Sequence, residues 1–248
     1  MDPLLLAPAF LLGALLYASV GHGGASAYLA IMALAHVAPE SMRPLALALN
    51  LLVSAVATWQ FARAGHFSWS LLWPFALASV PAAYLGGTVE LPTAYFRFFI
   101  GAVLAYAAIS LWLTPRGRAD FVAQTPSRPW SLVIGGGLGF AAGLTGVGGG
   151  IFLSPLLLMR GWATTRTTAA VSAAFIWLNS AAGIIPQAAR LPALSDTLLW
   201  AAPAVLVGGL AGSWIGARHA APVLLRRLLA AVLALAAAKL LATALSTL

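Results

Sequence analysis

Long apolar stretches make up most of this chain, and each one ends at a charge, a proline or a group of glycines. Most of them approach or exceed the roughly 20 residues that an α-helix needs to cross a bilayer core. They form two series of five. The first series comprises residues 3–20, 25–37, 44–62, 69–87 and 92–114, and the second comprises residues 130–145, 151–159, 167–189, 197–217 and 222–245. This pattern predicts an all-α integral membrane protein.

The two series resemble each other at three places, which indicates an internal duplication. The matching features are Gly21-His22-Gly23-Gly24 with Gly146-Val147-Gly148-Gly149, Arg63 with Arg190, and a helix opened by Pro92 with a helix opened by Pro222. Chance similarity between helices rich in alanine and leucine is the alternative. The one long polar segment lies between the series. We therefore predict a first transmembrane repeat at residues 1–114, a cytoplasmic linker at 115–129 and a second transmembrane repeat at 130–248.

The spacing of charges predicts that each repeat begins with a re-entrant helical hairpin. No charge lies between Asp2 and Glu40, and a straight helix of that length would measure about 55 Å, which exceeds the membrane thickness. The chain must turn within this stretch, and the glycines at 21–24 permit a turn because glycine adopts positive φ angles. The second arms, residues 25–37 and 151–159, are too short to span the bilayer.

The basic residues favour hairpins over broken spanning helices. Hairpins place nine basic residues on one face and four on the other, whereas broken helices divide them seven to six. An excess of Lys and Arg marks the cytoplasmic side. The nine are Arg63, Arg116, Arg118, Arg128, Arg160, Arg166, Arg218, Arg226 and Arg227, and the four are Arg43, Arg97, Arg190 and Lys239. Three full crossings then follow each hairpin, so the repeats are inverted and both termini are periplasmic. Lys239 is expected to snorkel toward the periplasmic face, with a role in the transport pathway as the alternative.

Composition supports the membrane location and limits the chemistry. Only 7% of the 248 residues are charged and 62% are apolar, whereas about a quarter of the residues in soluble domains are charged. The net charge of +8 comes from basic residues scattered between apolar stretches, which is typical of a topology signal and not of a nucleic-acid surface. The chain has no cysteine, so we expect no disulfide and no Cys-ligated metal.

The two glycine-rich turns, residues 19–25 and 145–150, are the predicted centre of substrate binding. Each turn would lie deep in the membrane and lead directly into a helix, whose first N–H groups have no partner within the helix. These N–H groups and the positive end of the helix dipole bind oxyanions without a cationic side chain. Glycine also serves tight helix packing in membranes, and we assign that role to Gly101, Gly208, Gly209 and Gly212.

Polar side chains inside the apolar stretches add hydrogen-bond donors. Asn50 and Ser54 lie one helical turn apart, and Ser172 and Asn179 lie two turns apart, so the members of each pair can share a helix face. Interhelical hydrogen bonding is the alternative role. His22 is expected to donate to the substrate or to carry a proton, with simple packing as the alternative. The predicted substrate-binding residues are Ser19, Gly21, His22, Gly23, Gly24, Asn50, Ser54, Thr145, Gly146, Gly148, Gly149, Gly150, Ser172 and Asn179.

The sequence lacks the features of an enzyme or of a cation pump. All five acidic residues lie at segment ends or in loops, so no carboxylate serves a proton or cation relay within the membrane. No HExxH motif, no P-loop and no nucleophile–base pair occurs, and we predict no metal site. A neutral centre that is rich in donors favours anions. The membrane potential also drives a monoanion outward by about 2.3 kcal/mol per 100 mV.

The second turn carries a motif that resembles a known signature. Residues 143–155 (GLTGVGGGIFLSP) and the weaker copy at 19–24 are similar to the signature of the sulfite exporter TauE/SafE family of bacterial membrane proteins. The resemblance covers essentially the whole chain. It implies an inner-membrane exporter of sulfite, sulfoacetate or other organosulfonates, with no tightly bound cofactor. The first copy departs from the motif, since His22 and Ala25 stand where the second copy has Val147 and Gly150.

Three functions remain open on the sequence alone. The first is export of small sulfur oxyanions, with the anion and the lipid bilayer as partners, no nucleic acid, and a homodimer as an open alternative to a monomer. The second is a permease for another anionic metabolite or sulfur compound, including uptake. The third is a non-transport role, as a membrane-embedded enzyme or an assembly subunit.

Overall fold

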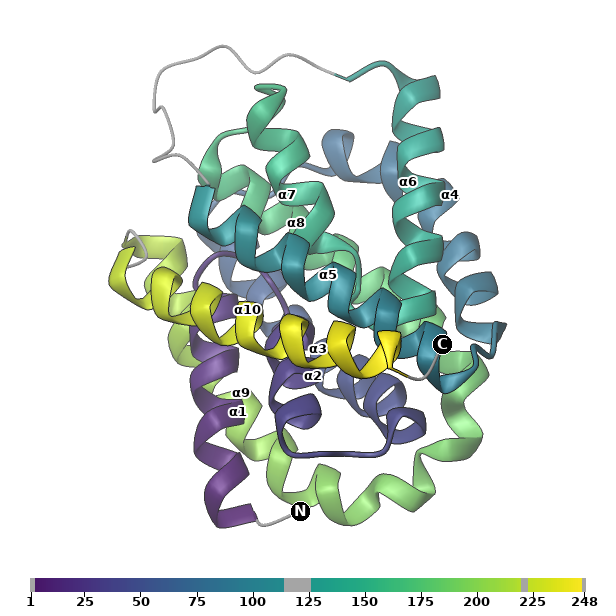
Figure 1. Ribbon diagram of the computed structural model, residues 1–248. Coiled ribbons are helices and arrows are strands. Elements are labelled where there is room, and N and C mark those ends of the chain that lie inside the picture. The colour runs from purple at the N-terminus through teal and green to yellow at the C-terminus, as the bar shows by residue number, and fades with distance from the viewer. Residues whose placement is uncertain (1–2, 114–125, 220–222, 247–248) are drawn as a thin grey trace.

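The computed structural model describes residues 3–113, 126–219 and 223–246 (Figure 1). Within these ranges the chain forms ten α-helices and two short 3-10 helices, and no strand. The α-helices are α1 (Pro3–Ala18), α2 (Ala25–Leu34), α3 (Pro39–Arg63), α4 (Trp69–Thr88), α5 (Thr93–Leu113), α6 (Arg128–Thr145), α7 (Gly150–Met159), α8 (Thr165–Ile184), α9 (Ser195–Arg218) and α10 (Val223–Leu245). Each apolar stretch coincides with one helix, which confirms the all-α prediction. Most of the predicted linker lies outside the described residues.

Helix lengths fit a multi-pass membrane protein with short helical arms. Among the described helices, α3, α4, α5, α8 and α9 contain stretches long and apolar enough to cross a membrane. The 25 residues of α3 measure about 38 Å, which exceeds the roughly 30 Å of a bilayer core. In contrast, α2 and α7 contain only 10 residues each, so each reaches about halfway across such a core.

The chain doubles back between α1 and α2, as the hairpin prediction requires. A Cβ atom on Gly13 of α1 would lie 3.0 Å from the Cβ atom of Ala27 on α2. The rings of Phe10 and Tyr28 stack with their centroids 5.4 Å apart. These contacts exclude a single broken helix, because its two parts would point away from each other. The start of α7 likewise lies against α6, where a Cβ atom on Gly149 would contact both α6 and α8.

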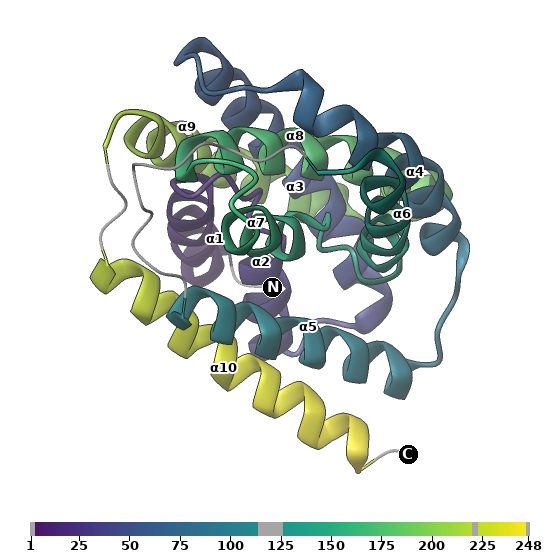
Figure 2. The same cartoon turned by 90° about the horizontal axis from the view of Figure 1, so that it is seen from above.

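The closest helix pairs join the two halves of the chain (Figures 1 and 2). α1 lies along α9, α4 along α6, α5 along α10, and α3 along α8. Glycines make the first two pairs possible, since Gly208 and Gly212 of α9 face α1 while Gly135 and Gly139 of α6 face α4. A Cβ atom on any of these four would come within 2.2 Å of a backbone carbonyl oxygen of the neighbouring helix. The packing role predicted for Gly208 and Gly212 is therefore confirmed.

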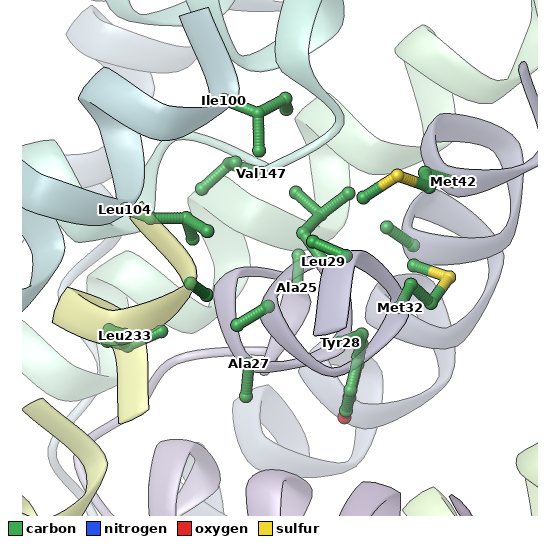
Figure 3. Packing of buried hydrophobic residues seen from close by; sticks show 14 of the residues in the cluster. Ala25, Ala27, Tyr28, Leu29, Met32, Met42, Ile100, Leu104, Val147 and Leu233 are labelled. Carbon is green, nitrogen blue, oxygen red and sulfur yellow. The ribbon is translucent and has the colours of Figure 1, made fainter. Parts of the chain in front are cut away.

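The paired helices α5 and α10 lie across one side of the bundle and cover the hairpins (Figure 2). The largest apolar cluster joins them to α1, α2 and α3. Figure 3 shows Val147 of the second glycine-rich turn in this cluster, beside Ile100 and Leu104 of α5 and Leu29 of α2. Packing on α5 and α10 therefore holds the glycine-rich turns inside the protein.

Lys239 of α10 fastens the end of the short helix α2. Its ammonium group donates hydrogen bonds to the carbonyl oxygens of Ala33 at 2.8 Å and Leu34 at 3.1 Å. These are among the last carbonyls of α2, which carry the negative end of the helix dipole, and the Ala33 carbonyl also accepts from the N–H of His36 at 3.3 Å. Lys239 therefore has a partner within the protein, a role that its sequence spacing did not indicate.

Candidate functional site

Two glycine-rich turns, which we name elbow 1 (residues 19–24) and elbow 2 (residues 145–149), lie together inside the helix bundle. All their residues are buried except Val20, which is half-buried. A Cβ atom on either Gly23 or Gly148 would collide with the same two side chains, Asn50 of α3 and Ile176 of α8. The elbows therefore meet where α3 and α8 pack against each other. The structure brings together two turns that are more than a hundred residues apart in the sequence.

Positive φ angles give the elbows their shape. They occur at Gly21 (78°), Gly24 (97°), Gly146 (81°), Gly148 (79°) and Gly149 (80°). Residues with a side chain rarely adopt this region, so glycine is required at these positions. Gly24 and Gly149 immediately precede α2 and α7. Each elbow therefore aims the N-terminal end of a short helix into the interior.

Asn50 connects the two elbows through hydrogen bonds. Its side-chain oxygen accepts from the N–H of Ala25 at 3.3 Å, at the end of elbow 1. Its side-chain nitrogen donates to the carbonyl oxygen of Val147 in elbow 2 at 3.4 Å and to the hydroxyl of Ser180 on α8 at 3.0 Å. Asn50 has no exposed surface. It stands at the predicted centre and also makes the interhelical bonds that we named as the alternative role.

Several backbone N–H groups at the elbows donate no hydrogen bond within the described part of the chain. On the side of elbow 1 and α2 they belong to Gly23, Gly24, Ser26 and Ala27, and on the side of elbow 2 and α7 to Val147, Gly148, Gly149, Gly150 and Ile151. Buried backbone donors in proteins are nearly always paired. Two sets of unpaired donors at helix N-termini have the geometry to satisfy an oxyanion.

His22 takes part in a chain of side-chain hydrogen bonds that joins elbow 1 to α7 and α8. Its Nε2 atom lies 2.9 Å from the hydroxyl of Ser154, and that hydroxyl donates to the hydroxyl of Ser172 at 2.8 Å. Because the proton of Ser154 is used toward Ser172, His22 donates from Nε2. Its buried Nδ1 atom has no partner among the described residues. Ser154, which links two predicted residues, was not selected from the sequence.

Three predicted hydroxyl groups donate to backbone carbonyls three or four residues earlier in the chain. Ser19 donates to Leu16 and Thr145 to Ala141, both at 2.7 Å, and Ser54 donates to Asn50 at 2.6 Å, in each case to the backbone carbonyl oxygen. Each of these hydroxyls satisfies a nearby helix carbonyl. The structure places Ser19 and Thr145 at the elbows, but their protons are already in use.

Asn179 faces away from the elbows. Its side-chain oxygen accepts from Ser79 of α4 at 2.6 Å, and its side-chain nitrogen is buried without a partner in the described residues. Helical spacing allows Ser172 and Asn179 to share a face, but their side chains meet different helices, α7 at Ser172 and α4 at Asn179. α7 begins beside Ile176 and runs toward Ser172, so it leads away from Asn179, and α4 is the neighbour of α8 at the level of Asn179.

Arg43 is a buried cation next to elbow 2 that the sequence assigned only to the membrane surface. Its guanidinium donates to the carbonyl oxygens of Gly87 at 2.9 Å, Val89 at 3.0 Å and Leu144 at 3.2 Å. These carbonyls lie at the C-terminal ends of α4 and α6, where the helix dipole favours a positive charge. The aliphatic part of Arg43 lies against Gly146. Arg43 thereby ties elbow 2 to the ends of α4 and α6.

Two cavities lie at opposite ends of α3, and Asn50 is near the middle of this helix. The smaller cavity, about 130 Å³, is lined by residues that include Glu40, Arg43, Glu90 and Arg190, and Glu90 and Arg190 form an ion pair there. The larger cavity, about 540 Å³, lies between the C-terminal ends of α3 and α9. The buried elbows are therefore flanked by one cavity on each side of the bundle.

Comparisons with known proteins agree along nearly the whole chain. Residues 5–240 match the family described as Sulfite exporter TauE/SafE. The probable membrane transporter protein y4hK of Sinorhizobium fredii (strain NBRC 101917 / NGR234) is 41% identical over 239 residues, which cover 95% of this chain and 97% of that protein. No solved structure matches the chain. The matched range contains both elbows, Asn50 and Arg43.

Proposed function

Because the chain belongs to the sulfite exporter TauE/SafE family and is a multi-pass membrane transporter, we propose that it exports small sulfur oxyanions across the bacterial inner membrane. Sulfite and organosulfonates such as sulfoacetate are the proposed substrates. The observation that carries this proposal is the pair of elbows, whose buried N–H groups have no acceptor within the described chain. Such donors match the three oxygen atoms of a sulfite ion or of a sulfonate group.

In the proposed mechanism the anion binds between the elbows and takes the place of the Asn50 side chain. The oxygen of Asn50 accepts from Ala25 and its nitrogen holds Val147, so this amide keeps the elbows closed when no substrate is present. An oxyanion offers a stronger acceptor to the same N–H groups, because hydrogen bonds to a charged group are about twice as strong as neutral ones. The nitrogen of Asn50 is then free to donate to the anion as well.

We further propose that the two halves are inverted repeats that alternate access to the elbows. In the predicted repeats α1 corresponds to α6, and α4 corresponds to α9. The observed pairs α1 with α9 and α6 with α4 are therefore equivalent, which supports this proposal. Both pairs are also packed through glycines. Under this topology the larger cavity faces the cytoplasm, the smaller cavity with Arg43 and Arg190 faces the periplasm, and both termini are periplasmic.

Transport of this kind needs no coupling ion. The acidic residues Glu40, Glu90 and Asp196 lie at or near helix ends among the described residues, so no carboxylate at the elbows repels the anion or relays protons. The membrane potential drives a monoanion outward by about 2.3 kcal/mol per 100 mV. Export as a uniport therefore has a sufficient driving force.

Sulfite flux in proteoliposomes tests the proposal, with two glycine variants as a matched pair. A Cβ atom in Gly148→Ala would lie 2.4 Å from the side-chain nitrogen of Asn50, which joins the elbows, whereas a Cβ atom in Gly137→Ala meets nothing within 4 Å. We expect sulfite flux from the wild type and Gly137→Ala, and at least a tenfold lower flux from folded Gly148→Ala. Equal flux from both variants would refute the site. Flux of another anion in place of sulfite or sulfonates would favour a permease of different substrate.

A further inference from the structure

The larger cavity, which we name the arginine cleft, lies between the C-terminal ends of α3 and α9. Its lining includes Trp59 and Arg63 from α3 and Trp214 and Arg218 from α9. Its volume of about 540 Å³ falls within the about 300–1,000 Å³ that is usual for small-molecule sites. We propose that the arginine cleft binds the phosphate headgroup of an anionic phospholipid. This site is separate from the elbows and goes beyond the proposed transport function.

Each arginine of the cleft lies over a tryptophan of the same helix. The guanidinium carbon of Arg63 is 4.9 Å from the ring centroid of Trp59, and that of Arg218 is 5.0 Å from the ring centroid of Trp214. Stacking of this kind fixes the direction of the guanidinium while leaving its N–H groups open to an anion. Tryptophan is enriched at the headgroup level of bilayers, which is where a phosphate group lies.

The positive charge of the cleft is not neutralised by any described carboxylate. Glu40 lies at the other end of α3 from Arg63, about 35 Å away along the helix, and Asp196 lies about 33 Å from Arg218 along α9. Glu90 pairs with Arg190 instead. A further cation, Arg166, donates to the backbone carbonyl oxygen of Arg218 at 3.3 Å. Basic pockets of this kind between transmembrane helices are suited to lipid headgroups.

An exposed apolar stripe on α9 leads into the cleft and offers a surface for the acyl chain of such a lipid. Leu199, Val207, Leu210 and Trp214 are 75%, 57%, 45% and 47% exposed, and their spacing places them along one side of the helix. The stripe extends about 22 Å from Trp214, more than the roughly 15 Å that half of a bilayer core measures. An acyl chain would cover this stripe while its phosphate occupies the cleft.

Native mass spectrometry of the purified full chain in detergent tests this proposal. The probes are dioleoyl phosphatidylglycerol, phosphatidylcholine with the same acyl chains, and glycerol phosphate as the headgroup without chains. Each arginine near an anionic lipid contributes about fivefold in affinity, so we expect phosphatidylglycerol to bind about 25-fold more tightly than phosphatidylcholine. The double variant Arg63→Gln/Arg218→Gln should lose this preference. Arg63→Lys/Arg218→Lys should keep most of it, and Arg190→Gln, which changes an arginine of the other cavity, should keep all of it.

Three results would overturn the proposal. The wild type binding both lipids equally, or Arg190→Gln losing as much preference as the double variant, would show that the cleft is not a specific site. Glycerol phosphate binding with the same dependence on Arg63 and Arg218 would make the cleft a vestibule for soluble anions. If the double variant is not monodisperse, the single Gln variants replace it, each with a fivefold loss expected. The readout is lipid binding, so its outcome is independent of whether sulfite is transported.

Discussion

Asn50→Ala is the substitution that most directly perturbs the contact between the elbows. It removes the acceptor of the Ala25 N–H and the donor to Val147 and Ser180. Interhelical hydrogen bonds in membrane proteins contribute about 0.6 kcal/mol each on average, which gives about 2 kcal/mol for three. A buried polar group that is left unpaired costs about 1–3 kcal/mol, and at least two groups lose their partner. We therefore expect the free energy of unfolding to fall by about 2–4 kcal/mol.

Ser54→Ala provides the matched control, because Ser54 lies one turn further along the same helix and is equally buried. Its hydroxyl donates to backbone carbonyls of α3 itself, so its removal should change stability by less than about 0.5 kcal/mol. The assay is reversible unfolding in mixed detergent micelles, followed by circular dichroism at equal protein concentration. Equal stability of Asn50→Ala and Ser54→Ala would show that Asn50 does not connect the elbows.

Asn50→Asp separates structure from transport at the same position. The carboxylate keeps an acceptor for the Ala25 N–H but loses the two donated bonds and places a negative charge where the anion is proposed to bind. We expect sulfite flux from this variant to fall by more than the flux from Asn50→Ala, since like charges within a buried site repel strongly. A variant that transports sulfite as fast as the wild type would contradict binding of the anion beside Asn50.

The remaining predictions concern the elements that position the elbows. Gly139→Ala should lower the free energy of unfolding by at least about 2 kcal/mol, because its Cβ atom would lie 2.1 Å from the carbonyl oxygen of Ser79 and overpacking of this degree is costly. Gly137→Ala, whose Cβ atom would meet open space, is the control in the same unfolding assay. Arg43→Gln should lower stability by about 2–4 kcal/mol, since up to three buried carbonyls lose a charged donor, and an unchanged unfolding midpoint would refute the structural role of Arg43. Lys239→Met should leave the free energy of global unfolding within about 1 kcal/mol of the wild type. It should speed amide hydrogen exchange at the C-terminal end of α2, because the ammonium group binds two carbonyls there. Unchanged exchange at this end of α2 would contradict the role assigned to Lys239.

The sequence was most informative where a single chemical property determines structure. Apolar runs located the helices because a helix in lipid must carry apolar side chains along its length, and the runs agree with the observed helices to within a few residues at most ends. The glycines of residues 21–24 and 146–149 located the elbows, because a sharp turn inside a membrane needs positive φ. Asn50, which was selected as a polar residue inside an apolar stretch, lies at the elbows.

Residues whose partners lie far away along the chain were not found in this way. Arg43 bonds to the carbonyl of Leu144, 101 residues away, and Lys239 to that of Ala33, 206 residues away. Backbone carbonyls at helix ends have no signature in the sequence, so these contacts required the tertiary arrangement. Asn179 bonds to Ser79 of α4, a contact that could not be read from the sequence, since helical spacing gives the face of a residue but not which helix lies beside it at that level.

Locating a bound oxyanion is the measurement that tests the binding of anions between the elbows most directly. Selenite is an analogue of sulfite whose selenium gives an anomalous diffraction signal. In crystals of the full chain grown with selenite, we expect one anomalous peak between the elbows, within about 3–4 Å of the backbone nitrogens of Gly24 and Gly149, with the Asn50 side chain displaced. An occupied peak in either cavity with none between the elbows, from protein that transports selenite, would contradict the proposed site.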